Sequence, residues 1–353
     1  MIESKDGIIQ EDIEILVNSF DSKFDILKGK TVFITGASGL IGSLLVRTLI
    51  CMNRIKNANI NVIAQVRNKE SFIQSFNDYP NSNLKIYEGN INKAIIIDDD
   101  IDYIVHLACP TSSPYFVSNP VETMETIVLG TKNILDLAKN KNVQGLLYSS
   151  SLEVYGVIDK NLITEKDYGY IDVLNTRSSY SLGKRTAELL CYSYFKEYNV
   201  PVKIARLTQS FGPGVLYDDK RVFAEFARCV IEKKDIVLHT DGVTKRNYLY
   251  LRDAVNALLY VLLFGINGEA YNVANKNTAI TIKDMAEYVC KLFPEAGIKV
   301  KIDIPDDISS FGYNPTMTVV LDTSKIEELG WESTADLDVC FKNLVKSMKN
   351  NNK

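Results

Sequence analysis

The segment KTVFITGASGLIG at residues 30–42 decides the fold of this chain. It begins as a short β-branched strand and turns abruptly at Gly36 into a helical apolar pattern that starts at Leu40. Gly36 permits a tight turn, Gly39 lets the backbone approach a pyrophosphate, and Gly42 allows close packing of helix on strand. Because the helix N-terminus also supplies N–H donors and a favourable dipole, the motif predicts a dinucleotide site. The expected cofactor contacts are Gly36, Ser38, Gly39, Leu40, Ile41 and Gly42.

The alternation of strand and helix continues along the chain. Strands are expected at 30–35, 61–66, 84–87, 103–107, 145–149 and 202–207, and helices at 11–20, 40–52, 120–140 and 176–198. Most of these strands are apolar on both faces, which is typical of a parallel sheet covered by helices on both sides. The expected fold class is therefore α/β, a doubly wound parallel Rossmann sheet.

After residue 207 the pattern loosens into a smaller, interwoven C-terminal region that we expect to bind the substrate. Helices are expected there at 221–233, 281–293 and 323–330, with a short strand at 298–302. The predicted organisation is a lead-in helix at 1–28, a dinucleotide-binding domain at 29–207 to which 243–276 return, a substrate-binding region at 208–242 and 277–345, and a tail at 346–353. The Asn/Lys-rich residues 349–353 of this tail are expected to be frayed.

The composition of the 353-residue chain excludes several classes of protein. Hydrophobic residues at 46% and charged residues at 24% are typical of a globular protein, and a formal charge of −4 does not indicate a nucleic-acid partner. His106 and His239 are too few for a three-histidine zinc site, and no metal is expected. Scattered cysteines, no signal peptide and no long apolar run predict a cytoplasmic protein without a membrane segment.

The second expected strand ends in AQVRN at residues 64–68. In dinucleotide sites an acidic residue about 20 residues after the glycine motif usually binds the adenosine ribose. Arg67 stands there instead, where it either meets the 2′-phosphate of NADP or stacks on adenine. We therefore expect NAD as the cofactor, with NADP left open by Arg67.

Tyr180 and Lys184, in YSLGK at residues 180–184, form a second constellation. They are four residues apart on an expected helix, so the phenol and the ammonium can point at the same spot. A free phenol has a pKa near ~10, and a neighbouring cation favours the phenolate. Such a tyrosine can act as a general base, which a histidine-poor enzyme needs.

The segment SSSLEVYG at residues 149–156 follows an expected strand. Ligands bind at the carboxyl ends of strands in a parallel sheet, so Ser151 and Glu153 are expected to face the site. Taken singly, the serines would be ordinary loop caps and Glu153 a surface carboxylate. Their order after the glycine motif and before Tyr180 favours a shared active site.

Together these motifs make the chain similar to the extended short-chain dehydrogenase/reductases that modify nucleotide sugars. The resemblance extends from about residue 29 to 340. Further matching stretches are HLA at 106–108, FGP at 211–213, RNYLYLRD at 246–253, YNVA at 271–274 and LGW at 329–331. Within the family, ACP at 108–110, NP at 119–120 and YSLGKRTAE at 180–188 look most like UDP-glucuronate decarboxylases.

The resemblance implies a common first step on a nucleotide-diphosphate sugar. Tyr180 would take the proton of the sugar 4-hydroxyl while a hydride passes to the nicotinamide. Lys184 would bind the nicotinamide ribose and lower the Tyr180 pKa, and Ser151 would hydrogen-bond near the reacting oxygen. Arg246 would hold the substrate diphosphate, which suits a planar guanidinium. Further cofactor contacts implied in this way are Asn90, Ile91, Leu107 and Ala108.

The fate of the resulting 4-keto sugar separates the subgroups. Glu153 matches both decarboxylases and 4,6-dehydratases, whereas Leu152 replaces the acidic residue of dehydratases and the serine of decarboxylases. Gln209, implied to lie near the substrate phosphates, replaces a usual Asn, and Asn90 replaces an Asp expected to read adenine. Decarboxylation is therefore expected slightly ahead of 4-epimerisation and 4,6-dehydration.

Two readings from other classes stay open. Arg67 favours an NADPH-dependent carbonyl reductase, and a non-catalytic dinucleotide sensor could share the fold, because fold alone does not fix function. The set of Ser151, Tyr180 and Lys184 argues against a sensor, which needs no base. The resemblance further implies a homodimer, with the helices at 120–140 and 176–198 forming an intersubunit bundle, and a role in polysaccharide biosynthesis.

Overall fold

The computed structural model describes residues 3–76, 82–305 and 316–351. Its strands are β1 (Thr31–Thr35), β2 (Asn61–Val66), β3 (Leu84–Glu88), β4 (Tyr103–His106), β5 (Gly145–Ser151), β6 (Val202–Leu207), β7 (Gln209–Phe211), β8 (Ile236–Leu238), β9 (Lys245–Arg246), β10 (Tyr248–Tyr250), β11 (Ala270–Val273), β12 (Ile280–Thr281), β13 (Val300–Ile302) and β14 (Thr318–Val319). Its α-helices are α1 (Gly7–Ser19), α2 (Leu40–Lys56), α3 (Lys69–Ser75), α4 (Ser113–Ser118), α5 (Pro120–Lys141), α6 (Ser178–Tyr198), α7 (Val222–Glu232), α8 (Leu251–Phe264), α9 (Ile282–Leu292), α10 (Ser324–Glu327) and α11 (Leu337–Asn351). Short 3-10 helices are η1 (Ser22–Leu27), η2 (Leu152–Tyr155), η3 (Lys276–Thr278) and η4 (Pro294–Ala296).

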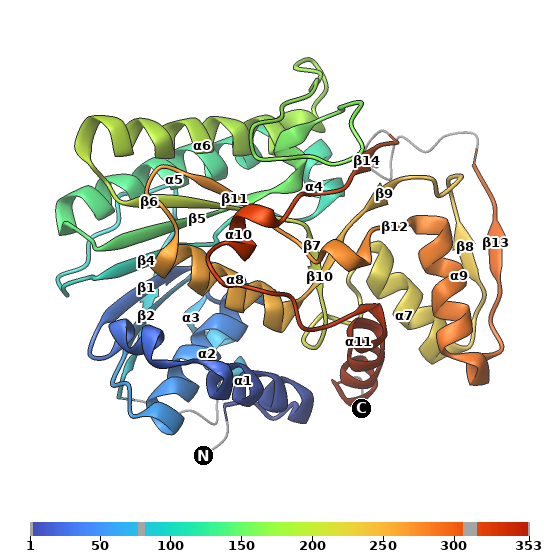
Figure 1. Ribbon diagram of the computed structural model, residues 1–353, viewed down its shortest axis with the longest axis horizontal. Coiled ribbons are helices and arrows are strands. Elements are labelled where there is room, and N and C mark those ends of the chain that lie inside the picture. Colours follow the sequence, from blue (N-terminus) through green and yellow to red (C-terminus); the bar gives the residue numbers. More distant parts are fainter. Residues whose placement is uncertain (1–2, 77–81, 306–315, 352–353) are drawn as a thin grey trace.

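A seven-stranded parallel sheet forms the centre of the molecule (Figure 1). Its strand order is β11-β6-β5-β4-β1-β2-β3. After β3 the chain returns to the other side of β1, so the order reverses between β1 and β4. Parallel sheets bind ligands at the carboxyl ends of the strands beside such a switch point. The predicted doubly wound α/β fold is confirmed.

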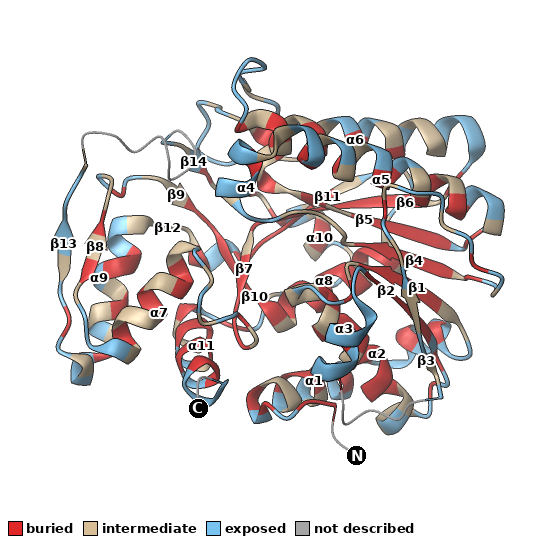
Figure 2. Cartoon of the chain, turned by 180° about the vertical axis from the view of Figure 1, so that it is seen from behind, coloured by how far each residue is buried: buried red, intermediate tan, exposed pale blue. Residues whose placement is uncertain are grey.

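The two faces of β1 explain the two helical layers. Val32 and Ile34 belong to a core shared with α2 and α8, whereas Phe33 belongs to a second core shared with α5 and α6. Figure 1 shows these helix pairs on opposite sides of the sheet, and Figure 2 shows the sheet strands as mostly buried. Burial on both faces is the reason why the strand is a continuous apolar run. The N-terminal helix α1 packs against α2 and α8.

A smaller region lies beside the sheet and has a core of its own (Figure 2). Helices α7, α9 and α11 pack there against aromatic residues of β7 and β10. The short strands pair as β7 with β10, β8 with β13, and β9 with β12 and β14. Between these segments the chain returns to the main sheet, which β11 joins at its edge next to β6.

The C-terminus differs in part from the frayed end expected at 349–353. Helix α11 continues to Asn351, although Lys349, Asn350 and Asn351 are exposed. Apolar residues continue at helical spacing along α11, and Ser347 Oγ donates to Asp6 Oδ2 at 2.5 Å. The prediction of a frayed end is therefore wrong up to Asn351, and residues 352–353 lie outside the described residues. The helix expected at 323–330 is also shorter, since α10 spans only Ser324–Glu327.

Across residues 3–76, 82–305 and 316–351, no helix has both the length and the apolar character needed to cross a membrane.

Candidate active site

The turn between β1 and α2 lies at the switch point of the sheet. Gly36 has a φ of +65°, and a Cβ on it would lie 2.9 Å from the Cα atom of Ala108. A Cβ on Gly42 would lie 2.2 Å from the carbonyl oxygen of Gly36. Helix α2 begins after Gly39, and in the described chain no side chain caps its N-terminus. Its first N–H groups are therefore available to an anion such as a pyrophosphate.

The other predicted contacts from this motif surround the turn. Ser38 and Gly39 are exposed in the turn itself, and Leu40 and Ile41 form the partly buried first turn of α2. All the glycine-motif residues predicted to hold a cofactor therefore come together in one place.

Gln65, which was not predicted as a site residue, supports this turn from β2. The Gly36 N–H donates to Gln65 Oε1 at 3.2 Å, and Gln65 Nε2 donates to the carbonyl oxygen of Gly89 at 2.7 Å. The buried amide thus ties the glycine turn to the end of β3. A lone polar residue inside the apolar run of β2 is the signal that could have identified it.

Arg67 and Asn90 follow the paired ends of β2 and β3, where Val66 lies opposite Glu88. Both side chains are exposed. Asn90 Oδ1 accepts from the N–H of Asn92 at 2.9 Å, whereas the neighbouring Ile91 is buried. The structure therefore places the residues predicted for the adenosine half of the cofactor at one sheet edge.

His106, at the end of β4, is a structural link. The hydroxyl oxygen of Thr35 accepts from the N–H groups of Leu107 and Ala108, both at 3.1 Å, so its proton is directed to His106 Nδ1 at 2.7 Å. Nε2 then carries the ring proton and donates to Thr131 Oγ1 at 3.2 Å. Burial lowers the pKa of His106 to about 3, so the ring is neutral. It fixes the backbone after β4 and does no acid–base work.

Tyr180 and Lys184 lie on α6 beside the end of β5. The Tyr180 ring stacks on Phe116 of α4 with ring centroids 4.4 Å apart. Lys184 Nζ donates to the carbonyl oxygen of Ser149 at 2.7 Å and lies 5.8 Å from the centroid of the Tyr180 ring. The helical spacing thus brings phenol and ammonium to the same part of the molecule.

Burial controls the protonation of Tyr180. It raises the pKa of the phenol well above the ordinary value, and the nearby Cys109 and Glu153 raise that pKa further. A hydrogen bond with Ser151 lowers it, but by less. Lys184 is directed at the carbonyl oxygen of Ser149, and in this arrangement burial keeps the pKa of the phenol above its ordinary value. Tyr180 is a neutral phenol in this arrangement.

Glu153, in η2, is held by two donors. Arg177 Nη2 donates to Oε1 at 2.9 Å and Ser181 Oγ donates to Oε2 at 3.0 Å. Ser151 Oγ accepts from the backbone N–H of Glu153 at 3.2 Å and so begins η2. Arg177 and Ser181 were not predicted as site residues, although their positions three before and one after Tyr180 place them close to it in sequence.

Arg246 and Gln209, predicted to bind substrate, lie on β9 and β7. Gln209 is opposite Tyr248 in the β7–β10 pair, and Arg246 is only 8% exposed. Among the described residues, Arg246 Nε, Gln209 Oε1 and the Tyr248 hydroxyl are buried without a hydrogen-bond partner. Buried polar groups without partners are costly, so these atoms indicate a polar ligand. The guanidinium favours an anionic one.

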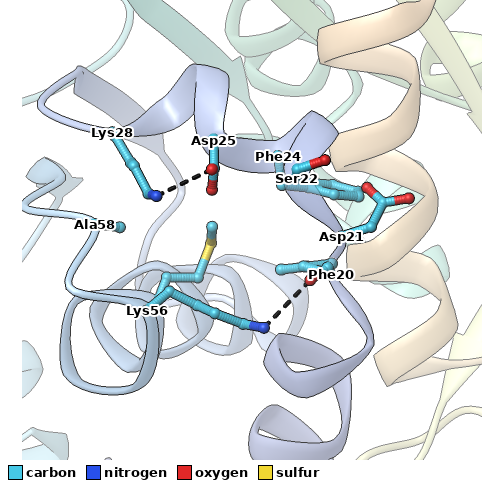
Figure 3. Close-up of a pocket in the computed structure, with 9 residues that line it drawn as sticks. Phe20, Asp21, Ser22, Phe24, Asp25, Lys28, Lys56 and Ala58 are labelled. Carbon is cyan, nitrogen blue, oxygen red and sulfur yellow. Dashed lines mark hydrogen bonds and ion pairs between the residues drawn. The ribbon is translucent and has the colours of Figure 1, made fainter.

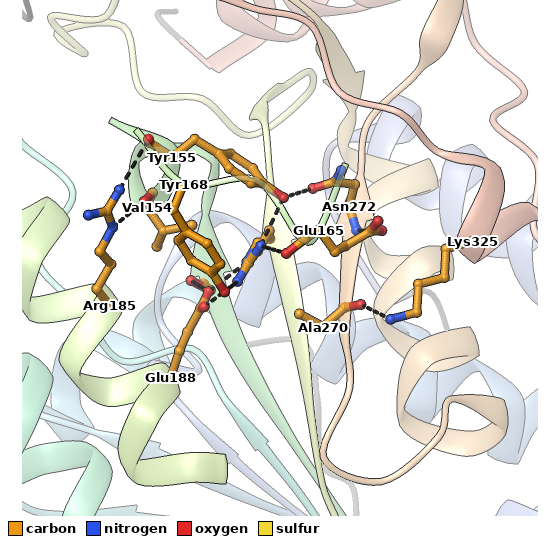
Figure 4. A network of polar contacts seen from close by, with 11 residues as sticks. Val154, Tyr155, Glu165, Tyr168, Arg185, Glu188, Ala270, Asn272 and Lys325 are labelled. Carbon is orange, nitrogen blue, oxygen red and sulfur yellow. Dashed lines mark hydrogen bonds and ion pairs between the residues drawn. The ribbon is translucent and has the colours of Figure 1, made fainter. Parts of the chain in front are cut away.

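A buried ion pair anchors the loop that leads to Tyr180 (Figure 4). Arg206 of β6 donates to both carboxylate oxygens of Glu188, at 3.0 and 2.7 Å. Arg206 also donates to the carbonyl oxygen of Glu165 and to the hydroxyl of Tyr168, both at 2.8 Å and both in the loop. The loop is thereby held against the sheet.

Other parts of the described chain offer weaker sites. A hollow between η1 and α2 has two cations that are already bound, because Lys28 pairs with Asp25 at 3.0 Å and Lys56 donates to the carbonyl oxygen of Phe20 at 3.2 Å (Figure 3). Among all the residues that the structure describes, no group of three or more His, Cys, Asp or Glu could hold a metal ion.

The chain is similar in sequence and in fold to known proteins. A model of the NAD dependent epimerase/dehydratase family matches residues 32–274. UDP-glucuronic acid decarboxylase 2 of Arabidopsis thaliana is 32% identical over 328 residues, which cover 91% of this chain and 69% of that protein. A UDP-glucose 4-epimerase from Thermotoga maritima has the same fold, with a TM-score of 0.77 at 21% identity over 92% of this chain and 100% of that one. A UDP-glucuronic acid 4-epimerase from Bacillus cereus gives 0.75 at 22% identity over 91% and 99%.

Proposed function

We propose that this chain, which belongs to the NAD dependent epimerase/dehydratase family, oxidises the C4 hydroxyl of a nucleotide-diphosphate sugar and then removes CO2 from a glucuronate-type sugar. The observation that carries the proposal is that Tyr180, Lys184 and Ser151 lie close together at the carboxyl end of β5. The name of the curated relatives, UDP-glucuronic acid decarboxylase, supports decarboxylation as the second step.

The glycine turn fits NAD. Neither Gly36 nor Gly42 has room for a Cβ, because backbone atoms lie too close to each of them. The uncapped start of α2 offers N–H donors to the pyrophosphate. Lys184 would hold the nicotinamide ribose. When bound, NAD supplies the hydride acceptor and a positive charge beside the phenol.

Tyr180 performs the proton transfer in this proposal. Its neutral, buried phenol must first lose its own proton, and added positive charge in the site favours that loss. The Tyr180 oxygen then takes the proton of the 4-hydroxyl, which Ser151 orients. Loss of the C4 hydride to the nicotinamide would give a 4-keto sugar, and a carboxylate in the β-position to that ketone would leave as CO2. A proton would then replace CO2 at C5, and C4 would regain the hydride while its oxygen regains the proton held by Tyr180. Arg246, Gln209 and Tyr248 would bind the diphosphate.

A 4-epimerase and a 4,6-dehydratase share this opening step and are the alternatives within the family. An NADPH-dependent carbonyl reductase is the alternative of another class, and the exposed position of Arg67 at the end of β2 supports binding of a 2′-phosphate. A non-catalytic dinucleotide sensor is disfavoured by the presence of a partly buried tyrosine beside a buried lysine.

Product masses distinguish these reactions. The purified protein is incubated with NAD and, separately, UDP-glucuronate, UDP-glucose and dTDP-glucose. We expect loss of CO2 from UDP-glucuronate, whereas loss of water would indicate a dehydratase and unchanged mass with altered NMR couplings an epimerase. Tyr180→Phe should abolish turnover and keep NAD bound. Turnover of no sugar, with NADPH consumed on simple carbonyls, would overturn the proposal.

The outer face of α5 and α6 supports a homodimer. The two helices pack side by side, and Leu129, Leu189 and Tyr192 are exposed on them. Exposed apolar groups on one helical layer favour association. Leu189→Glu should convert a dimer to a monomer in analytical ultracentrifugation. A nucleotide-diphosphate sugar as the substrate is consistent with a cytoplasmic enzyme of polysaccharide biosynthesis.

A further inference from the structure

Arg177 occupies a central position beside Tyr180. It is 6% exposed, and its Nη2 atom lies 2.9 Å from Glu153 Oε1. Its Cζ atom lies 4.9 Å from the centroid of the Phe116 ring, on which Tyr180 stacks. Arg177 therefore contacts both the carboxylate and the aromatic ring that border the phenol.

The two oxygens of Glu153 are both engaged. One accepts from Arg177 and the other from Ser181, at 2.9 and 3.0 Å. Charge-assisted hydrogen bonds of this kind fix the orientation of a carboxylate. Both oxygens of Glu153 are therefore held by donors from the start of α6.

We propose that Arg177 is a positioning residue that holds the Glu153 carboxylate in an ion pair, so that Tyr180 alone accepts a proton from the sugar. The proposal rests on the proposed C4 oxidation and adds a residue that influences what happens to the 4-keto sugar. Elimination of water next to a 4-ketone requires a base for the C5 proton. With Glu153 engaged by Arg177, that base is withheld and the 4-keto sugar is directed away from dehydration.

The charges around Tyr180 agree with this role. Glu153 raises the pKa of Tyr180, and Arg177 lowers it. Removing Arg177 leaves a poorly compensated anion next to the phenol, whereas neutralising Glu153 leaves an uncompensated cation. A charge at this range moves a pKa by on the order of one unit. The two substitutions should therefore shift the pKa of the base in opposite directions.

The test is the pH dependence of the single-turnover rate of cofactor reduction in wild type, Arg177→Met, Glu153→Gln and the double variant. Arg177→Met should move the acid limb upward by about one pH unit and slow the rate about tenfold near neutral pH. Glu153→Gln should move the limb downward by about one unit. In the double variant both charges are gone, so the acid limb should return to within about half a pH unit of its wild-type position.

Arg185→Met is the matched control. Arg185 lies on the same helix but donates to backbone carbonyls, those of Val154, Tyr155 and Gly169. Its loss should leave the acid limb in place. A double variant whose limb stays as displaced as in Arg177→Met alone, or a limb that does not move in Glu153→Gln, would overturn the proposal. Glu153→Gln decides the question even if Arg177→Met does not fold. Wild-type turnover tests the proposed function separately, since the role of Arg177 is read only from differences between variants.

Discussion

Replacing Gly42 with alanine tests whether the contact between α2 and the glycine turn sets the cofactor site. The new methyl group would lie 2.2 Å from the carbonyl oxygen of Gly36 and 3.0 Å from the Cα atom of Ala37. Optimal contacts between carbon atoms are about 3.5–4.0 Å. Since both neighbours are backbone atoms, no side-chain rotation relieves the clash. The helix and the turn must separate by roughly 1 Å, as the difference between these distances requires.

The expected change in the free energy of unfolding is the cost of overpacking less the gain in helix propensity. Overpacking costs about 1–3 kcal/mol, and the better helix propensity of alanine returns about 1 kcal/mol. We expect the free energy of unfolding to fall by about 0–2 kcal/mol. The shift also moves the first N–H groups of α2, and weakening two hydrogen bonds to a charged pyrophosphate costs about 3 kcal/mol, or about 100-fold in NAD affinity.

Calorimetric titration with NAD and denaturant unfolding measure the two effects. The matched control is Gly7→Ala at the start of α1, where a Cβ would meet nothing within 4 Å. The control should bind NAD as wild type does. A Gly42→Ala variant that binds NAD within about threefold of wild type would show that the close approach does not position the donors, and would refute this reasoning.

Three further predictions concern buried charge and cofactor choice. Burial lowers the pKa of Lys203 to about 8, so the folded state binds this proton more weakly than the unfolded state, and the free energy of unfolding should rise from about pH 8 to 10.5. Lys203→Met should remove that rise and stabilise the protein by about 1–2 kcal/mol near neutral pH. An unchanged pH profile in denaturant unfolding would contradict this. Arg206→Met leaves Glu188 buried without its cation and should cost about 3–5 kcal/mol in the same assay, most of it recovered by adding Glu188→Leu. Arg67→Asp should weaken NADP binding at least about tenfold relative to NAD, and an unchanged ratio of the two affinities would exclude Arg67 from the adenosine site.

Local patterns were sufficient for six of the seven strands of the main sheet, all except β11. The strands expected at 61–66 and 202–207 match β2 and β6 to the residue, because strands buried on both faces are continuous apolar runs. The glycine turn was also predictable, since its requirements lie within one strand, one turn and one helix. Helix α4 was missed, because six residues are too few to display a helical period.

The site required contacts that no spacing reveals. Glu153 was identified from its place after β5, but the two donors that engage it come from the start of α6. Gln65 reaches from β2 to the turn after β1 and to the residue after β3. These pairings depend on how the loop before α6 folds and on the order of strands in the sheet, neither of which is a local property.

For Tyr180, the sequence predicts the position of the side chain but not its pKa. The spacing of Tyr180 and Lys184 predicts correctly that both side chains lie on one side of α6, because that depends only on helical period. It does not predict the pKa, because Phe116 from the unpredicted helix α4 stacks on the phenol and burial raises its pKa. Lys184 meanwhile binds the carbonyl oxygen of Ser149. Spacing within one helix therefore identifies the candidate base, whereas the neighbouring elements that close around it decide how much additional positive charge it needs before it can act.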